Sequence, residues 1–164
     1  MRAPLNIKTD YLNIQLDLAA QRTKELADLA YGRAVGMPLR DVRLLRMIGV
    51  QPGISMGTLA HDSGLEKSLA SKVVGSLVAR GLVEKSMGQK DARNVHLLLT
   101  DKGVEVVEKA EPLGKKLESG FLILVTEEEL KVLRKALHKV LAAEAVARDE
   151  FEAWLDQTNL RVVA

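Results

Sequence analysis

The sequence predicts a mainly α-helical protein with a small antiparallel β wing. Apolar residues recur every three or four positions in several long segments. Two short helical patterns also meet at the turn Asp62-Ser63-Gly64, and two strand patterns then flank a basic loop ahead of Leu99-Thr100-Asp101-Lys102-Gly103. This order, from Gly53 to Gly103, is typical of a helix-turn-helix followed by a wing.

The N-terminal third of the chain predicts two helices. Residues 11–31 repeat apolar side chains with a helical period, and Gly32, Gly36 and Pro38 then interrupt the pattern. The period resumes over 39–50 and ends at Gln51-Pro52-Gly53. We therefore expect an N-terminal arm and helix over 1–36, the winged helix-turn-helix over 37–100 and further helices over 101–164.

The helix-turn-helix itself has readable ends and faces. Ser55 can cap its first helix, and Gly64 can adopt the left-handed conformation that turns the chain into the second. In that second helix, over 67–80, one face is apolar and is expected to pack inward: Ala70, Val73, Val74 and Leu77. The opposite face is small, polar and basic: Ser68, Ser71, Lys72 and Gly75.

The wing and the C-terminal helices follow. Residues 82–85 and 94–99 predict paired strands around the loop 86–93, with Val95, Leu97 and Leu99 as the inward row. Thr100 can cap the next helix, and Thr126-Glu127-Glu128-Glu129 is a capping box for a last helix that reaches about residue 156. A helix of some 30 residues spans about 45 Å, more than a small core needs, so its apolar stripe is expected to meet another chain.

Composition excludes several classes of function. With 164 residues, 47% of them hydrophobic, the chain can bury one core with helical extensions. It has no cysteine, which excludes disulfides and thiolate metal sites within this chain. It also has no apolar run long enough for a membrane span and no signal-peptide pattern, so we expect a soluble cytoplasmic protein that does not bind membranes. Only 3% of residues are aromatic, which disfavours base stacking of single strands.

Positive charge is concentrated in the winged segment. The whole chain has 24 Lys and Arg against 22 Asp and Glu, but residues 66–93 hold six basic and three acidic side chains. The rest of the chain therefore has a net charge of about −1. A local excess of this kind is what attraction to phosphates requires.

Catalytic chemistry is poorly represented. His61, His96 and His138 stand singly, without the spacing of a metal site, and are interpreted as surface or structural histidines. No glycine-rich phosphate loop occurs. We expect no catalytic residue, no metal, no cofactor and no enzyme.

The winged segment resembles the MarR family of bacterial transcriptional regulators. The likeness rests on residues 59–74, 77, 80–85, 91–93 and 99–103, and above all on Asp91-Ala92-Arg93 in the wing combined with Leu-Thr-x-x-Gly after it. It implies a homodimer joined by N- and C-terminal dimerisation helices, in which each winged helix reads half of a pseudo-palindromic operator in double-stranded DNA. It also implies a repressor that a small-molecule effector of unknown identity relieves.

The resemblance assigns roles to individual residues. Ser68, Ser71 and Lys72 lie where the family's recognition helix enters the major groove, and hydroxyl and ammonium groups suit base edges and phosphates. Arg93 resembles the minor-groove arginine of the wing, where a narrow groove favours a cation. Asp91 is expected to hold Arg93 or the wing backbone in position.

Two lysines and three departures from the family pattern complete the picture. Lys67 and Lys90 add positive charge to the recognition helix and the wing, and we include both among the DNA-binding residues. Glu66 replaces the usual Ser or Thr cap, so a poorer cap and some repulsion of phosphates are expected. Leu69 replaces a small polar residue, and Gly75 costs about 1 kcal/mol of helix stability relative to Ala.

Alternatives of a different class stay open at this stage. A winged helix can also bind another protein without binding DNA, with the basic wing as a solvated loop, and a small enzyme with a carboxylate or histidine in a cleft is a third option. Four residues near the second helix could line an effector pocket, although such side chains are more often core: Tyr31, Met37, Arg43 and Met47.

Overall fold

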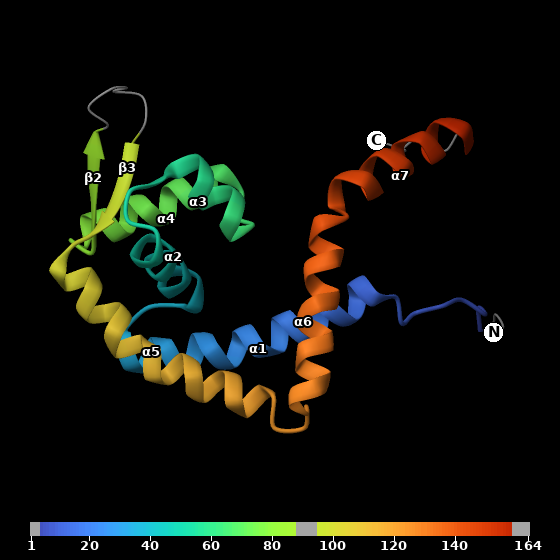
Figure 1. Cartoon of the computed structure of the whole chain (residues 1–164), viewed down its shortest axis with the longest axis horizontal. Helices are drawn as coiled ribbons and strands as arrows, with labels where there is room; N and C mark the ends of the chain where they lie inside the picture. The colour runs from blue at the N-terminus through green and yellow to red at the C-terminus, as the bar shows by residue number, and fades with distance from the viewer. Residues whose placement is uncertain (1–3, 88–94, 159–164) are drawn as a thin grey trace. The chain divides into compact units, whose positions relative to one another are not determined.

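The computed structural model describes residues 4–87 and 95–158, and the chain divides into two compact units, Met1–Phe121 and Leu122–Ala164. The first unit contains the helices α1 (Leu12–Val35), α2 (Leu39–Val50), α3 (Met56–Ser63), α4 (Lys67–Ala79) and α5 (Asp101–Phe121), with the strands β1 (Ile54–Ser55), β2 (Val83–Met87) and β3 (Val95–Leu99) (Figure 1). The second contains α6 (Glu127–Ala142) and α7 (Glu144–Thr158). The predicted mainly helical fold with a small antiparallel sheet is confirmed.

The sheet of the first unit has one strand more than the sequence predicts. β2 and β3 form the expected antiparallel hairpin, in which Val83 pairs with Leu99 and Lys85 with Leu97. β1 adds a third, antiparallel strand on the other side of β3, with Ile54 opposite Leu97. A strand of two residues has no period to detect, and it forms because β3 offers it an open edge.

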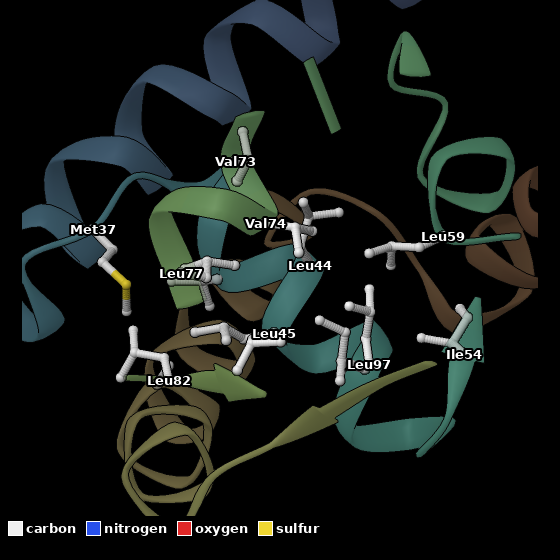
Figure 2. Close-up of a cluster of buried hydrophobic side chains, with 14 of the residues drawn as sticks. Met37, Leu44, Leu45, Ile54, Leu59, Val73, Val74, Leu77, Leu82 and Leu97 are labelled. Carbon is white, nitrogen blue, oxygen red and sulfur yellow. The ribbon is translucent and has the colours of Figure 1, made fainter. Parts of the chain in front are cut away.

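The core lies between α2, α3, α4 and the sheet. Leu44, Leu45 and Ile48 of α2 are fully buried, and they meet the buried faces of the neighbouring elements. Figure 2 shows the cluster, with side chains from these elements pointing toward one another: Ile54, Leu59, Val73, Val74, Leu77, Leu82 and Leu97. Their burial fixes the orientation of α4 relative to the hairpin, because a rotation of the helix would expose Val74 and Leu77 to water.

α1 and α5 pack side by side and lie below α2, α3 and α4 in the orientation of Figure 1. Tyr31 of α1 and Ala110 of α5 are both buried in the same core as α2. Between them, Arg46 of α2 donates a hydrogen bond of 3.1 Å to the Ala110 carbonyl and forms a 3.0 Å ion pair with Glu111. Its guanidinium carbon lies 5.8 Å from the centre of the Tyr31 ring, so one side chain links three helices.

The second unit corrects one expectation. The capping box at Thr126 is confirmed: the Glu129 amide donates to Thr126 Oγ1 at 3.2 Å, and the Thr126 amide donates to Glu129 Oε2 at 2.9 Å. The prediction of a single helix from there to about residue 156 is wrong, because the helix ends at Ala142 and a new one begins at Glu144. Ala143 has ψ −5°, away from the helical value of about −42°.

The break has a local electrostatic counterpart. Glu144 begins α7, where a negative charge is favoured by the helix dipole, and it pairs with Arg148 one turn later at 2.7 Å. No glycine or proline marks the site in the sequence, and the one local sign is Glu144, which interrupts the apolar series between Val140 and Ala147.

Both units expose apolar side chains along their helices. No residue of α6 or α7 is buried, and Phe151 and Trp154 are about half exposed although their rings stack at 5.7 Å. In α1, only Ala27 and Tyr31 are buried, whereas Leu12, Leu26 and Leu29 are exposed. Among the described residues, no helix is both long and apolar enough to cross a membrane.

Candidate nucleic-acid interface

The helix-turn-helix is built from α3, a tight turn and α4. Ser55 caps α3 as predicted, because its side chain accepts a hydrogen bond from the Thr58 amide at 3.1 Å. Gly64 ends the helix with φ +65°, a left-handed conformation that favours glycine, and this prediction is also confirmed. The Leu65 amide then donates to the Ala60 carbonyl at 3.2 Å, which secures the turn into α4.

α4 has the two faces that the sequence predicts. Ala70, Val73, Val74 and Leu77 are all buried against α2, α3 and the hairpin. Ser68, Ser71 and Lys72 are exposed. Gly75 lies on the same exposed face, and a Cβ added to it would have no neighbour within 4 Å. The core thus holds one side of the helix and leaves a polar, cationic side free.

Glu66 is the residue that caps the start of α4. Its carboxylate accepts hydrogen bonds from the Ser68 amide at 3.3 Å and from the Ser68 hydroxyl, and the expectation that it caps less well than Ser or Thr stays a prediction. Two methylenes separate a glutamate carboxylate from its Cα, which lets the carboxylate fold back over the first turn. The negative charge also lies at the positive end of the helix dipole.

The junction between the hairpin and α5 explains the Leu-Thr-x-x-Gly motif. The Thr100 hydroxyl donates to the Gly81 carbonyl at 2.7 Å and accepts from the Gly103 amide at 3.1 Å, so Thr100 caps α5 as predicted. The Thr100 amide donates to the Leu82 carbonyl at 3.2 Å. A side chain at Gly103 would collide with that same carbonyl, so the motif fastens the base of the wing to the end of α4.

Exposed basic side chains lie on α4 and on the segments next to it. Lys67 and Lys72 lie on α4, Arg80 follows its last turn and Lys85 lies on β2. Lys102 was not singled out from the sequence, yet its Nζ donates to the Arg80 carbonyl at 3.2 Å and adds a cation near the end of α4. The one sequence signal for Lys102 is its position in the Thr-x-x-Gly segment, two residues after the cap Thr100.

The tip of the wing lies outside the described residues. The predicted roles of Lys90, Asp91 and Arg93 therefore stay predictions. The same applies to DNA contact by Lys67, Ser68, Ser71 and Lys72, although the structure places these four on one exposed helix surface.

The histidines have structural or surface surroundings. His96 is half-buried, and its Nδ1 lies 2.7 Å from the Gly53 carbonyl, which ties β3 to the loop before β1. His61 and Asp62 are neighbours on the exposed end of α3, with 2.9 Å between Nδ1 and Oδ1. Within the described ranges, no three His, Asp or Glu side chains are grouped as a metal site would require.

The four candidate effector-pocket residues separate. Tyr31 and Met37 are buried core residues, and Arg43 is exposed. Met47 lines an open, mostly apolar cleft of about 280 Å³ together with Arg46, Val50, Gln51, Ile54 and Asp62. The structure therefore does not bring the four together in one pocket.

These elements define a winged helix-turn-helix protein. A family model described as MarR family matches residues 35–94, which include α2, α3, α4 and the first hairpin strand, β2. The chain is 30% identical over 133 residues to the HTH-type transcriptional regulator PetP of Rhodobacter capsulatus, a match that covers 80% of this chain and 67% of PetP. It is 34% identical over 105 residues to the HTH-type transcriptional regulator BilQ of Clostridium symbiosum, covering 64% of this chain and 73% of BilQ.

The chain belongs to the MarR family and is a transcriptional regulator, not an enzyme. Solved structures share its fold. A mutant MarR of Escherichia coli complexed with operator DNA superposes with a TM-score of 0.73 at 21% identity, covering 79% of this chain and 93% of that one. The MepR–DNA complex of Staphylococcus aureus gives a TM-score of 0.73 at 18% identity, covering 82% and 99%.

Proposed function

We propose that this protein is a homodimeric repressor that binds a pseudo-palindromic operator in double-stranded DNA. The observation that carries the proposal is the exposed face of α4, where Ser68, Ser71 and Lys72 stand on a helix whose other face is locked into the core. Hydroxyls donate or accept, and a lysine reaches guanine acceptors or phosphates, so this surface suits the major groove.

The wing supplies the second contact in this proposal. β2 and β3 leave the core beside α4 and lead toward residues 88–94. By resemblance, Arg93 enters the minor groove. The Asp91 carboxylate would hold Arg93 or the wing backbone in position, and Lys90 would add positive charge against the phosphates. Lys85 and Lys102 add positive charge at the base of the wing, where the backbone of the duplex would pass.

The exposed apolar side chains support a second copy of the chain. α1, α6 and α7 present leucine, valine, phenylalanine and tryptophan to solvent in a single chain. Soluble monomers rarely leave apolar surface of this extent uncovered. A homodimer through the N- and C-terminal helices would cover it and would place two α4 helices for two half-sites about one helical turn of DNA apart.

A small-molecule effector is the third part of the proposal. One relative in fold, the PcaV regulator of Streptomyces coelicolor, was solved in complex with its natural ligand. Here, Arg46 of α2 contacts both α1 and α5. A ligand that moved α5 would therefore also move α2, which packs against α4. Such a ligand would relieve repression by changing the separation of the recognition helices.

Fluorescence anisotropy with a labelled duplex from the gene's own upstream region tests the proposal. We expect binding to be at least about 1000-fold tighter than to a scrambled duplex, with a salt slope of about −0.9 per phosphate neutralised. Lys72→Ala and Arg93→Ala should each weaken specific binding. Lys24→Ala removes the same charge from an exposed position of α1 and serves as the control.

Equal affinity for upstream and scrambled DNA would contradict the proposal and favour a protein-binding winged helix. Unchanged binding by Lys72→Ala and Arg93→Ala would contradict the assignment of the DNA-binding residues. Light scattering gives an independent check, since a monomer at micromolar concentration would refute the homodimer.

A further inference from the structure

Two side chains at the start of α4, those of Glu66 and Ser68, are hydrogen-bonded to each other. Glu66 and Ser68 are both exposed, and both lie at the end of α4 that a recognition helix presents to base edges. The Glu66 Oε2 atom accepts from the Ser68 amide and from the Ser68 hydroxyl. The two side chains therefore act as one polar unit on the open face of the helix.

This hydrogen bond decides what the pair can offer to DNA. A serine hydroxyl has one hydrogen and two lone pairs, and here the hydrogen points to the Glu66 carboxylate. The remaining lone pairs of Ser68 Oγ can only accept. An ionised carboxylate also accepts only, so the second Glu66 oxygen adds acceptors and no donor. The Glu66–Ser68 pair consequently presents only acceptors, whereas its neighbour Lys67 presents donors.

Base edges respond to such a surface in opposite ways. In the major groove, adenine N6 and cytosine N4 are donors, whereas guanine O6 and N7 and thymine O4 are acceptors. Guanine or thymine opposite the pair would place acceptor against acceptor beside a negative charge. Lys72, one turn further along α4, has only donors and fits guanine instead.

We propose that Glu66 and Ser68 together are a specificity determinant that selects an exocyclic amino group, of adenine or cytosine, at one position of each half-site. This inference rests on the proposed function, because it presumes that α4 reads duplex DNA. It also gives Glu66 a role that a plain helix cap would not have: its charge lowers affinity for phosphates but discriminates between bases.

Two substitutions separate reading from capping. Glu66→Gln keeps the size of the side chain but adds amide donors, so guanine and thymine become acceptable at that position. Glu66→Ser keeps a strong N-cap, removes the carboxylate and frees the Ser68 hydroxyl to donate. Circular dichroism and thermal melting of both variants establish that the fold is retained before DNA is added.

The experiment is a selection of binding sites from a randomised duplex library with the wild type and both variants. We expect the wild type to enrich adenine or cytosine at one position per half-site, and both variants to accept all four bases there while the other positions keep their preferences. An unchanged preference in both variants would overturn the inference and leave the proposed function standing. A wild type that enriches no sequence would refute the proposed function itself.

Anisotropy with modified duplexes then tests the amino group directly. Purine in place of adenine, or 2-pyrimidinone in place of cytosine, removes only the amino donor. This change should weaken binding of the wild type by about 5- to 100-fold. With Glu66→Ser it should have no more effect than the same change outside the half-sites, and an equal loss in wild type and variant would overturn the inference.

Discussion

Replacement of Gly103 by alanine tests how the wing is fastened to the recognition helix. A Cβ at this position would lie far inside van der Waals contact with the Leu82 carbonyl oxygen, 3.1 Å from the Leu82 carbonyl carbon and 3.3 Å from Leu99 Cδ2. The obstacle is backbone, so no rotamer change can relieve it. The first turn of α5 must move away from Leu82.

The cost follows from the contacts that this movement breaks. The Leu82 carbonyl accepts from the Thr100 amide, and the Gly81 carbonyl accepts from the Thr100 hydroxyl. Two hydrogen bonds cost about 1 kcal/mol each, and overpacking adds about 1–3 kcal/mol. Alanine recovers about 1 kcal/mol through its helix propensity. The net expected loss is therefore about 2–4 kcal/mol.

Urea unfolding followed by circular dichroism, at one fixed protein concentration, measures the loss. Gly120→Ala is the matched control, because Gly120 lies on the same helix with nothing near its missing side chain. It should leave stability unchanged or raise it by up to about 1 kcal/mol. A Gly103→Ala variant within about 0.5 kcal/mol of the wild type would refute this account of the Thr-x-x-Gly segment.

Three further outcomes are expected. A Cβ at Gly114 would lie 2.5 Å from Arg46 Nη2 and 2.9 Å from the hydroxyl of the buried Tyr31. Gly114→Ala should therefore cost about 1–3 kcal/mol in urea unfolding, and a stability equal to that of the wild type would contradict this. Gly75→Ala, which meets nothing, should stabilise the fold by about 1 kcal/mol, and a destabilised variant would show a contact that the isolated chain lacks. Hydrogen bonds from the Thr126 backbone and side chain lower the pKa of Glu129 below its ordinary value of 4.5. The stabilisation by Glu129 relative to Glu129→Gln should therefore be present above about pH 4.5 and disappear as the pH falls through the lowered pKa, and a difference that is constant from pH 7 to pH 2 would contradict it.

Features with a local cause were predictable from the sequence. α2 has the bounds 39–50 that its period and the following Gln51-Pro52-Gly53 indicate. Ser55 caps the start of α3 through its hydroxyl, and Gly64 ends the helix in the left-handed conformation that glycine favours. The inward face of α4 also follows from spacing alone. In each case the residue type and its neighbours within four positions determine the result.

Features that depend on distant partners or on one backbone angle were not predictable. β1 exists through its pairing with β3, some 40 residues later, and Arg46 finds Ala110 and Glu111 only once α2 and α5 have packed. The break at Ala143 is a change of torsion at a residue that favours helix. The hydrogen bond from the Ser68 amide to the Glu66 carboxylate was not predictable, because residue preferences rank glutamate as a weak cap and do not say where its carboxylate lies.

A footprint on the gene's own upstream DNA tests the central claim most directly. If the two α4 helices of a homodimer each bind one half of an operator, the wild type should protect two related half-sites about 10 base pairs apart, centre to centre. Lys72→Ala should abolish this protection at the same protein concentration, and Lys24→Ala should keep it. Absence of protection by the wild type, or an identical footprint with Lys72→Ala, would contradict the account.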